Sequence, residues 1–116
     1  MRAFNEDPSE LIELPPDELL AGVKGGRLSL IDVRPEREFS AGHLPGARSC
    51  PLDTLRQALP KLRGTVVVYC RGPYCLGAKE AVALLRKAGV RARRLPLGVM
   101  EWRTLGQPLV AEPTGI

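Results

Sequence analysis

Residues 66–75 have the sequence VVVYCRGPYC, in which a short apolar, β-branched run ends at a cysteine. Such a run is typical of a buried strand. A second cysteine, Cys75, lies five positions after Cys70 and directly before a segment whose apolar residues recur at helical spacing. A thiol between the end of a buried strand and the start of a helix lies among unpaired backbone N–H groups, which favour the reactive thiolate. The stretch therefore predicts a strand–loop–helix unit with a nucleophilic cysteine in its loop.

Strand and helix patterns alternate on both sides of this unit. From apolar, β-branched composition we expect strands at residues 11–14, 28–33, 48–51, 65–69 and 90–95. From apolar spacing and from Pro, Gly and acidic boundary residues we expect helices at residues 15–25, 34–39, 53–59 (capped by Asp53 or Thr54), 76–88 and from 97 onward. The alternation predicts an α/β domain with a mostly parallel sheet covered on both faces. Ligands bind outside the carboxyl ends of the strands in such sheets, and Cys70 falls at that edge.

The length and composition favour one globular domain. The chain has 116 residues, 44% of them hydrophobic and 26% charged, which fits a single core. We expect residues 10–116 to form that domain and residues 1–9, which are polar and show no periodicity, to form a flexible arm. No run approaches the ~18 apolar residues that span a membrane, and the N-terminus lacks the apolar centre of a signal peptide. The sequence therefore predicts a cytoplasmic protein with no membrane partner.

Charge and cysteine content argue against several classes of partner. The net charge is +4, but the basic residues are spread along the chain and aromatic residues make up only 4%, so we expect no nucleic-acid partner. Three cysteines in a chain without a signal peptide do not indicate a disulfide scaffold. Their spacing, with His43 as the single histidine, matches no familiar zinc site, so we expect no metal and no cofactor.

The loop from Cys70 to Cys75 has the chemistry of an anion cradle. Gly72 permits an unusual backbone angle, and Arg71 adds a fixed positive charge if its side chain points inward. Pro73 removes one N–H donor. Such a cradle would stabilise a thiolate, a persulfide anion or a bound oxyanion. The N–H groups that we expect to contribute are those of Gly72, Tyr74, Cys75 and Leu76.

Each cysteine also has a structural interpretation. Cys70 is either a nucleophile or simply a small apolar residue that ends a strand. Cys75 is a resolving thiol, a filler in the first helical turn or a second nucleophile. Cys50 is interpreted as structural, because Ser49 and Pro51 beside it suggest nothing reactive.

Four blocks of sequence give the chain a family resemblance. They are LIDVR at residues 30–34, FSAGHLPGA at 39–47, VVYCRG at 67–72, and LGVMEW at 97–102 followed by GQPL at 106–109. In this order they resemble the strand end, the F-x3-H-[IL]-P-G-A signature, the active-site loop and the GG-x3-W-x3-G-x-P ending of a single-domain rhodanese, with leucine where the first glycine of the ending is usual. The resemblance implies a rhodanese-like three-layer fold, with a mostly parallel five-stranded sheet and helices on both faces.

Rhodaneses are sulfurtransferases, so the resemblance implies a persulfide carried on Cys70. A sulfane-sulfur donor such as thiosulfate would load it, and cyanide, a thiol or a protein sulfur acceptor would unload it. Asp32 and Arg34 would lie at the edge of the pocket. His43, hydrogen-bonded within its own loop, and Trp102, in the core, would be framework residues. The substrate-binding positions would be the rest of the loop: Arg71, Gly72, Pro73, Tyr74, Cys75 and Leu76.

The loop departs from the common rhodanese pattern C-R-x-G-x-R. Pro73 stands in place of the glycine, and Cys75 in place of the last basic residue. Without that cation the case for the thiosulfate dianion as the natural donor is weaker, whereas Cys75 offers a thiol that could attack a persulfide on Cys70 or close a disulfide. A C-R-G-P-Y-C loop resembles the one in rhodanese domains fused to arsenic-type transcriptional repressors. The sequence contains no helix-turn-helix pattern, so a regulatory role would need a separate partner.

Two other functions remain open. One is a dithiol reductase, of arsenate or of a protein disulfide, that uses Cys70 and Cys75. The other is a non-catalytic rhodanese-like sensor or binding module, which the cysteine at position 70 argues against. A phosphatase is not expected, because the sixth position after Cys70 holds Leu76 where those enzymes need an arginine.

Overall fold

Strands and helices alternate along the chain in the computed structural model, which describes residues 10–62, 64–72 and 75–111. The arm expected at residues 1–9 and the loop residues Pro73 and Tyr74 lie outside the described residues. The helices are α1 (Pro16–Lys24), α2 (Glu36–Ala41), α3 (Leu52–Gln57), α4 (Leu76–Lys87) and α5 (Val99–Thr104). The strands are β1 (Leu28–Asp32), β2 (Arg48–Ser49), β3 (Thr65–Tyr69) and β4 (Ala92–Arg94).

The four strands form one parallel sheet in the order β2-β1-β3-β4. The central strands β1 and β3 are in register over all five residues of each. The strand expected at residues 11–14 is reduced to a single parallel bridge between Leu11 and Arg94 at the outer edge of β4. The sheet is therefore close to the five strands predicted, and the predicted α/β fold with a parallel sheet is confirmed.

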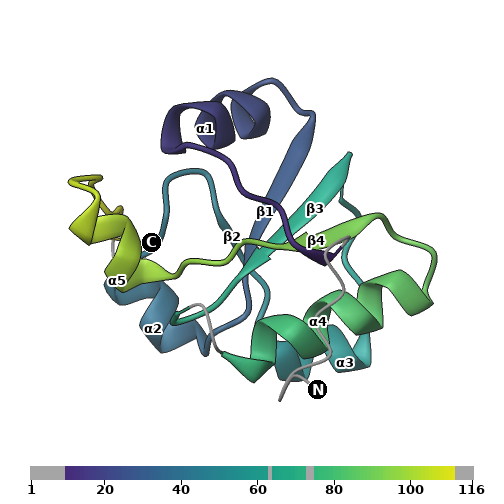
Figure 1. Cartoon of the computed structure of the whole chain (residues 1–116). Coiled ribbons are helices and arrows are strands. Elements are labelled where there is room, and N and C mark those ends of the chain that lie inside the picture. The colour runs from purple at the N-terminus through teal and green to yellow at the C-terminus, as the bar shows by residue number, and fades with distance from the viewer. Residues whose placement is uncertain (1–9, 63, 73–74, 112–116) are drawn as a thin grey trace, which may run out of the picture.

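Helices cover both faces of the sheet, with α1 and α5 on one side and α3 and α4 on the other (Figure 1). Successive side chains of β3 point to opposite faces of the sheet, so the strand contributes to the core on both sides. Val67 and Tyr69 pack with Trp102 of α5, whereas Val66 and Val68 pack with the buried residues of α4. Cys70 follows the same alternation as Val66 and Val68, so its side chain packs in the layer of α3 and α4.

Several element boundaries differ from the sequence prediction by one or two residues, those of α3 and β4 among them. The cap of α3 at Asp53 or Thr54 was wrong: the helix begins at Leu52 and its N-cap is Pro51, which makes no side-chain cap. Proline has a φ of −53° there, already near the helical value, and its carbonyl accepts the N–H of Leu55 at 2.9 Å. The strand expected at residues 90–95 is shorter, because only Ala92–Arg94 pair with β3. None of the helices in the described ranges is long and apolar enough to cross a membrane.

Candidate active site

Cys70 lies directly after β3, at the carboxyl edge of the sheet, in a hollow of about 410 Å³. Three connections line this hollow: β1 to α2, β2 to α3, and β3 to α4. All three begin at the carboxyl ends of parallel strands, where ligands bind in open α/β sheets. The topology therefore brings the predicted nucleophile to the position where this fold accepts a substrate.

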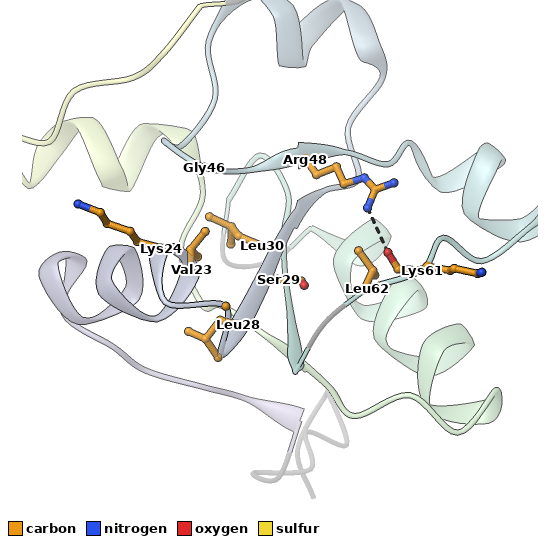
Figure 2. Close-up of a pocket in the computed structure, with 10 residues that line it drawn as sticks. Val23, Lys24, Leu28, Ser29, Leu30, Gly46, Arg48, Lys61 and Leu62 are labelled. Carbon is orange, nitrogen blue, oxygen red and sulfur yellow. Dashed lines mark hydrogen bonds between the residues drawn. The ribbon is translucent and has the colours of Figure 1, made fainter.

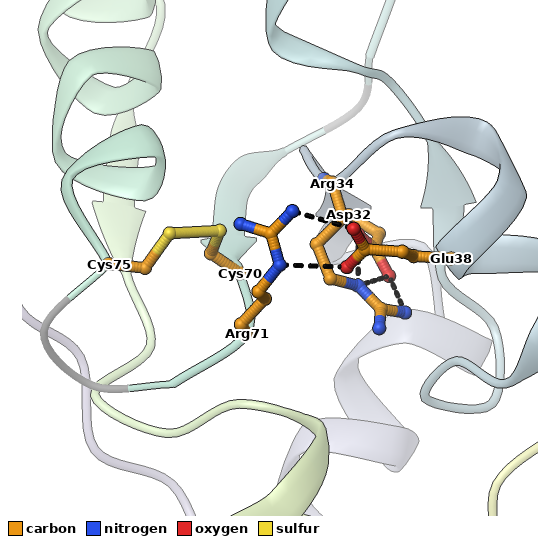
Figure 3. Close-up of a disulfide and its surroundings, with 6 residues drawn as sticks. All are labelled: Asp32, Arg34, Glu38, Cys70, Arg71 and Cys75. Carbon is orange, nitrogen blue, oxygen red and sulfur yellow. Dashed lines mark hydrogen bonds and ion pairs between the residues drawn. A yellow bond between two sulfur atoms is a disulfide. The ribbon is translucent and has the colours of Figure 1, made fainter.

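The two loop cysteines are joined. The structure records a disulfide between Cys70 and Cys75, with their Cα atoms 6.0 Å apart (Figure 3). Cys70 is 3% exposed and Cys75 is half-buried. A Cβ placed on Gly77, in the first turn of α4, would lie 3.6 Å from each sulfur, in ordinary contact. The loop can therefore bring the two thiols into bonding distance, which the sequence left undecided.

The loop runs into the N-terminus of α4, a helix of 12 residues. Cys75 is its N-cap residue and makes no side-chain cap, and the first turn contains no acidic residue. The unpaired N–H groups of that turn and the positive end of the helix dipole are therefore not offset by a carboxylate of the helix itself. This arrangement favours an anion on sulfur at the end of the loop. Leu76, a predicted substrate contact, is 67% exposed.

The guanidinium of Arg71 is bound to a carboxylate outside the loop. Its Nε donates to Glu38 Oε1 at 2.8 Å and its Nη2 to Oε2 at 2.6 Å, as Figure 3 shows. Hydrogen bonding between the two raises the pKa of Arg71 and lowers the pKa of Glu38. The positive charge of Arg71, which we expected to act on the loop, is thus neutralised by Glu38 of α2. The sequence analysis missed Glu38, whose only signal is its place directly before the FSAGHLPGA block.

Asp32 and Arg34 form a buried ion pair below the hollow. Arg34 Nη2 donates to Asp32 Oδ2 at 2.7 Å and to the carbonyl of Gly42, also at 2.7 Å. Burial and the neighbouring Asp32 strongly raise the pKa of Tyr69, which keeps that hydroxyl neutral. Arg34 lines the hollow, whereas Asp32 lies beneath it and is fully buried. The predicted pocket-edge residues are therefore adjacent, with Asp32 fixing the position of Arg34.

The predicted framework residues have the expected surroundings. His43 is buried, its Nδ1 lies 2.8 Å from the carbonyl of Phe39, and the two rings stack with centroids 3.7 Å apart. Trp102 is buried in the core and donates its indole N–H to the carbonyl of Pro108 at 2.9 Å. The expected hydrogen bond of His43 within its own loop and the expected burial of Trp102 are both present, and their role as framework residues stays a prediction.

Cys50 is a free, buried cysteine in the same core layer as Cys70. Burial raises the pKa of its thiol, so Cys50 is less reactive than an exposed cysteine. Within the described ranges no three His, Cys, Asp or Glu side chains lie close enough to hold a metal ion.

Gly98 holds α5 close to the active-site loop. A Cβ at this position would overlap the carbonyl of Arg71, so the loop backbone passes where any larger residue would extend. The N–H of Gly98 donates to the carboxylate of Glu101 at 2.8 Å, which caps α5. The LGVMEW block contained both residues, but the sequence did not indicate that they support the loop.

A second hollow of about 450 Å³ lies along the amino-terminal part of β1 (Figure 2). Lys24, Arg48 and Lys61 line it, and Arg48 donates to the carbonyl of Lys61 at 3.1 Å. The two lysine side chains extend away from one another in Figure 2. Its lining includes no cysteine, histidine or carboxylate, so we assign the chemistry to the hollow at Cys70.

A family model described as rhodanese-like domain matches residues 15–105. The chain belongs to the rhodanese-like family. This agrees with the resemblance of the four sequence blocks.

Curated relatives carry this rhodanese-like domain within longer proteins. An HTH-type transcriptional regulator, Rv0324 of Mycobacterium tuberculosis, is 45% identical over 94 residues, which cover 79% of this chain and 42% of the regulator. A "Probable adenylyltransferase/sulfurtransferase MoeZ" of the same organism is 34% identical over 102 residues, 82% of this chain and 25% of that protein. The chain thus spans less than half the length of either relative. The family supports sulfurtransferase-type chemistry in general.

Solved rhodanese-like structures share the fold. The BH2092 protein of Bacillus halodurans is 27% identical with a TM-score of 0.73, over 89% of this chain and 77% of that chain. The rhodanese-like domain of the Alr3790 protein of Anabaena is 25% identical with a TM-score of 0.67, over 92% of this chain and 86% of that chain.

Proposed function

We propose that this rhodanese-like domain is a sulfurtransferase that carries a persulfide on Cys70. The observation that carries the proposal is the place of Cys70: at the carboxyl edge of the sheet, beside the hollow and next to the N-terminus of α4. Helix-end N–H groups favour a thiolate and would equally favour a persulfide anion there. Gly72 and Leu76 are the described residues proposed to supply these groups, with Arg71 beside them and Arg34 at the pocket edge. The N–H of Cys75, which the sequence analysis included, donates instead to the carbonyl of Gly72 at 3.3 Å.

The reaction has two displacement steps at sulfur. The thiolate of Cys70 attacks the outer sulfur of a sulfane-sulfur donor, the sulfur–sulfur bond of the donor breaks, and the leaving group takes the electron pair. A thiophilic acceptor, cyanide or a thiolate, then attacks the outer sulfur of the persulfide and releases the Cys70 thiolate. The protein itself is neither oxidised nor reduced over the cycle, so no cofactor is required.

The disulfide favours a second candidate, a dithiol reaction. If Cys75 attacks the inner sulfur of the Cys70 persulfide, hydrosulfide leaves and the Cys70–Cys75 disulfide forms. An external dithiol must then reduce that disulfide before the next cycle. In this reaction Cys75 is the resolving thiol. A dithiol reductase that acts on arsenate or on a protein disulfide would use the same two cysteines.

The partners proposed are a small-molecule sulfur donor and a thiol or cyanide acceptor, or a protein sulfur acceptor. A cytoplasmic location remains a prediction from the sequence. A sensor role is a further alternative, because a relative named as a transcriptional regulator contains a similar domain. Such a role would not require turnover of the persulfide.

Intact-protein mass spectrometry tests the proposal. The reduced protein is incubated with a sulfane-sulfur donor, and the mass is recorded before and after a reductant. A reducible gain of one sulfur atom that maps to Cys70 and is absent from Cys70→Ser is the expected result. Cys50→Ser serves as the control because that thiol is buried. A sulfur gain that Cys70→Ser retains would contradict the proposal.

The variant Cys75→Ser separates the two candidates. A persulfide that persists longer in this variant than in the parent would identify Cys75 as the resolving thiol. An unchanged lifetime would leave Cys70 as the only reacting cysteine.

A further inference from the structure

We infer that Glu38 makes this pocket select a singly charged organic persulfide, R–S–S⁻, as sulfur donor over the thiosulfate dianion. The inference rests on the proposed function, because it concerns the donor that loads Cys70. Its basis is the pairing of the positive charges around the hollow. Both guanidiniums that line the hollow among the described residues, those of Arg34 and Arg71, are already bound to carboxylates, so neither is left for the second negative charge of a dianion.

The pair between Arg71 and Glu38 is the most direct evidence. Arg71 follows the nucleophile, and it lines the hollow. Both of its hydrogen bonds to Glu38, at 2.8 and 2.6 Å, are in the bidentate geometry that a guanidinium uses for an oxyanion. A donor oxyanion would need the same nitrogen atoms, and Glu38 occupies them. Arg71 is 60% exposed and Glu38 31%, so the pair stands at the mouth of the site, where substrate enters.

The other charges around the hollow are paired as well. Arg34 is bound to the buried carboxylate of Asp32 through three side-chain contacts between 2.7 and 3.1 Å. On the opposite wall, Asp53 is bound to Arg56 at 2.8 Å, and Arg56 also binds Glu80 at 2.7 and 2.9 Å. Both guanidiniums that line the hollow are therefore bound to carboxylates, and the carboxylate of Asp53, which also lines it, adds a negative charge at its rim.

What remains for binding an anion is the backbone. The N-terminus of α4 carries about half a positive charge, enough to favour one negative charge but not two. The rest of the lining includes apolar side chains from Val33, Pro51 and Leu52, which suit the carbon part of an organic donor. The sequence adds to this, since Cys75 stands where the common family loop has a second basic residue.

The two donors differ in the charge that the site must tolerate. With a persulfide, Cys70–S⁻ attacks the outer sulfur, the donor sulfur–sulfur bond breaks, and RS⁻ leaves with one negative charge. With thiosulfate the same attack breaks the bond to the sulfonate sulfur, and sulfite leaves as a dianion. Both steps balance, but the second concentrates one more negative charge beside guanidiniums that are already bound to Asp32 and Glu38.

The test compares second-order loading rates of the reduced full chain with the persulfide of 2-mercaptoethanol, which carries a single negative charge, and with thiosulfate. Loading is counted as the mass gain of one sulfur at Cys70 plus any Cys70–Cys75 disulfide that follows it. We expect a higher rate constant with the persulfide. The variant Glu38→Gln frees Arg71 and is expected to raise the thiosulfate rate constant about two- to fivefold, the range of a partly exposed charge pair, while the persulfide rate constant changes less.

Glu36→Gln is the matched control, because it removes the same charge from an exposed position on the same helix. It is expected to leave both rate constants unchanged. The inference is overturned if the parent reacts with thiosulfate as fast as with the persulfide, or if Glu38→Gln raises the thiosulfate rate no more than Glu36→Gln does. Loading from neither donor would overturn the proposed function and the inference with it, whereas loading without donor preference would overturn the inference alone.

Discussion

The three cysteines differ in surroundings more than in sequence context. Cys70 and Cys75 lie in the loop that opens onto the hollow, next to the first turn of α4. Cys50 lies in the same core layer but does not line the hollow, and burial raises the pKa of its thiol. Thiol reactivity depends on the fraction of thiolate and on access, so we predict that Cys70 and Cys75 are reactive and that Cys50 is not.

Alkylation should therefore separate them. After reduction and brief treatment with iodoacetamide near pH 7.5, we expect label at Cys70 and Cys75 and little at Cys50. Peptide mass spectrometry measures the label at each site. In urea all three should react alike, and equal labelling of Cys50 in the folded protein would contradict its placement in the core.

The pair of Asp32 and Arg34 is predicted to be the costliest charged contact to break. Asp32→Ala leaves the guanidinium of Arg34 buried without its carboxylate, which costs about 3–5 kcal/mol of folding free energy. The exposed pair of Asp53 and Arg56 is the comparison, since Asp53→Ala is expected to cost less than about 1 kcal/mol. Urea unfolding of the two variants measures the difference, and similar losses would show that the buried pair contributes little.

At the scale of elements, the active-site loop depends on a helix that supplies no catalytic group. The start of α5 lies against the backbone of the loop at Arg71, and only glycine at position 98 permits this approach. The N–H of Gly98 is capped by Glu101. The last sequence block thus supports the loop that contains Cys70, the proposed nucleophile.

Gly98→Ala is predicted to displace the loop. Its methyl group would overlap the carbonyl of Arg71, and overpacking of this kind costs about 1–3 kcal/mol of stability. The rate of sulfur loading at Cys70 should fall as well. Thermal unfolding and the mass-spectrometric loading assay measure the two effects.

Gly77→Ala is the control for stability. A Cβ there makes ordinary contacts of 3.6 Å with both sulfurs and lies within α4, where alanine is preferred to glycine by about 0.5–1 kcal/mol. We expect it to unfold at the parent temperature or above. Equal destabilisation by both substitutions would contradict the steric account of Gly98.

At the scale of the whole molecule, the contact between Arg71 and Glu38 joins the loop after β3 to α2, and it depends on pH. The ion pair lowers the pKa of Glu38 from its ordinary value of 4.5. Its contribution to stability is therefore present above pH 4.5 and is lost as the pH falls through the lowered value. Protonation of Glu38 would release Arg71 from the pair.

The stability difference between the parent and Glu38→Gln should follow this dependence. We expect the parent to be the more stable protein at pH 7 and the two to converge as the pH falls below 4.5. Urea unfolding at several pH values measures the difference, with Glu36→Gln as control. A difference that stays constant with pH would show that the ion pair does not contribute.

The sequence determined much of this protein by itself. The strand Thr65–Tyr69 was predicted with its observed bounds, and so was the place of Cys70 at the edge of the sheet. These features are local, because a continuous apolar, β-branched run and a helix pattern after it depend only on neighbouring positions. The four blocks also led to the family that the family model confirms.

Only the tertiary structure decided the electrostatics of the site. Arg71 and Glu38 are 33 positions apart, and nothing in the local pattern of either residue indicates the other. The contact of Gly98 with the loop and the bond between Cys70 and Cys75 likewise depend on how the chain packs. A residue type tells which charge or thiol a position brings, but the free energy of that group is set by what the fold places beside it.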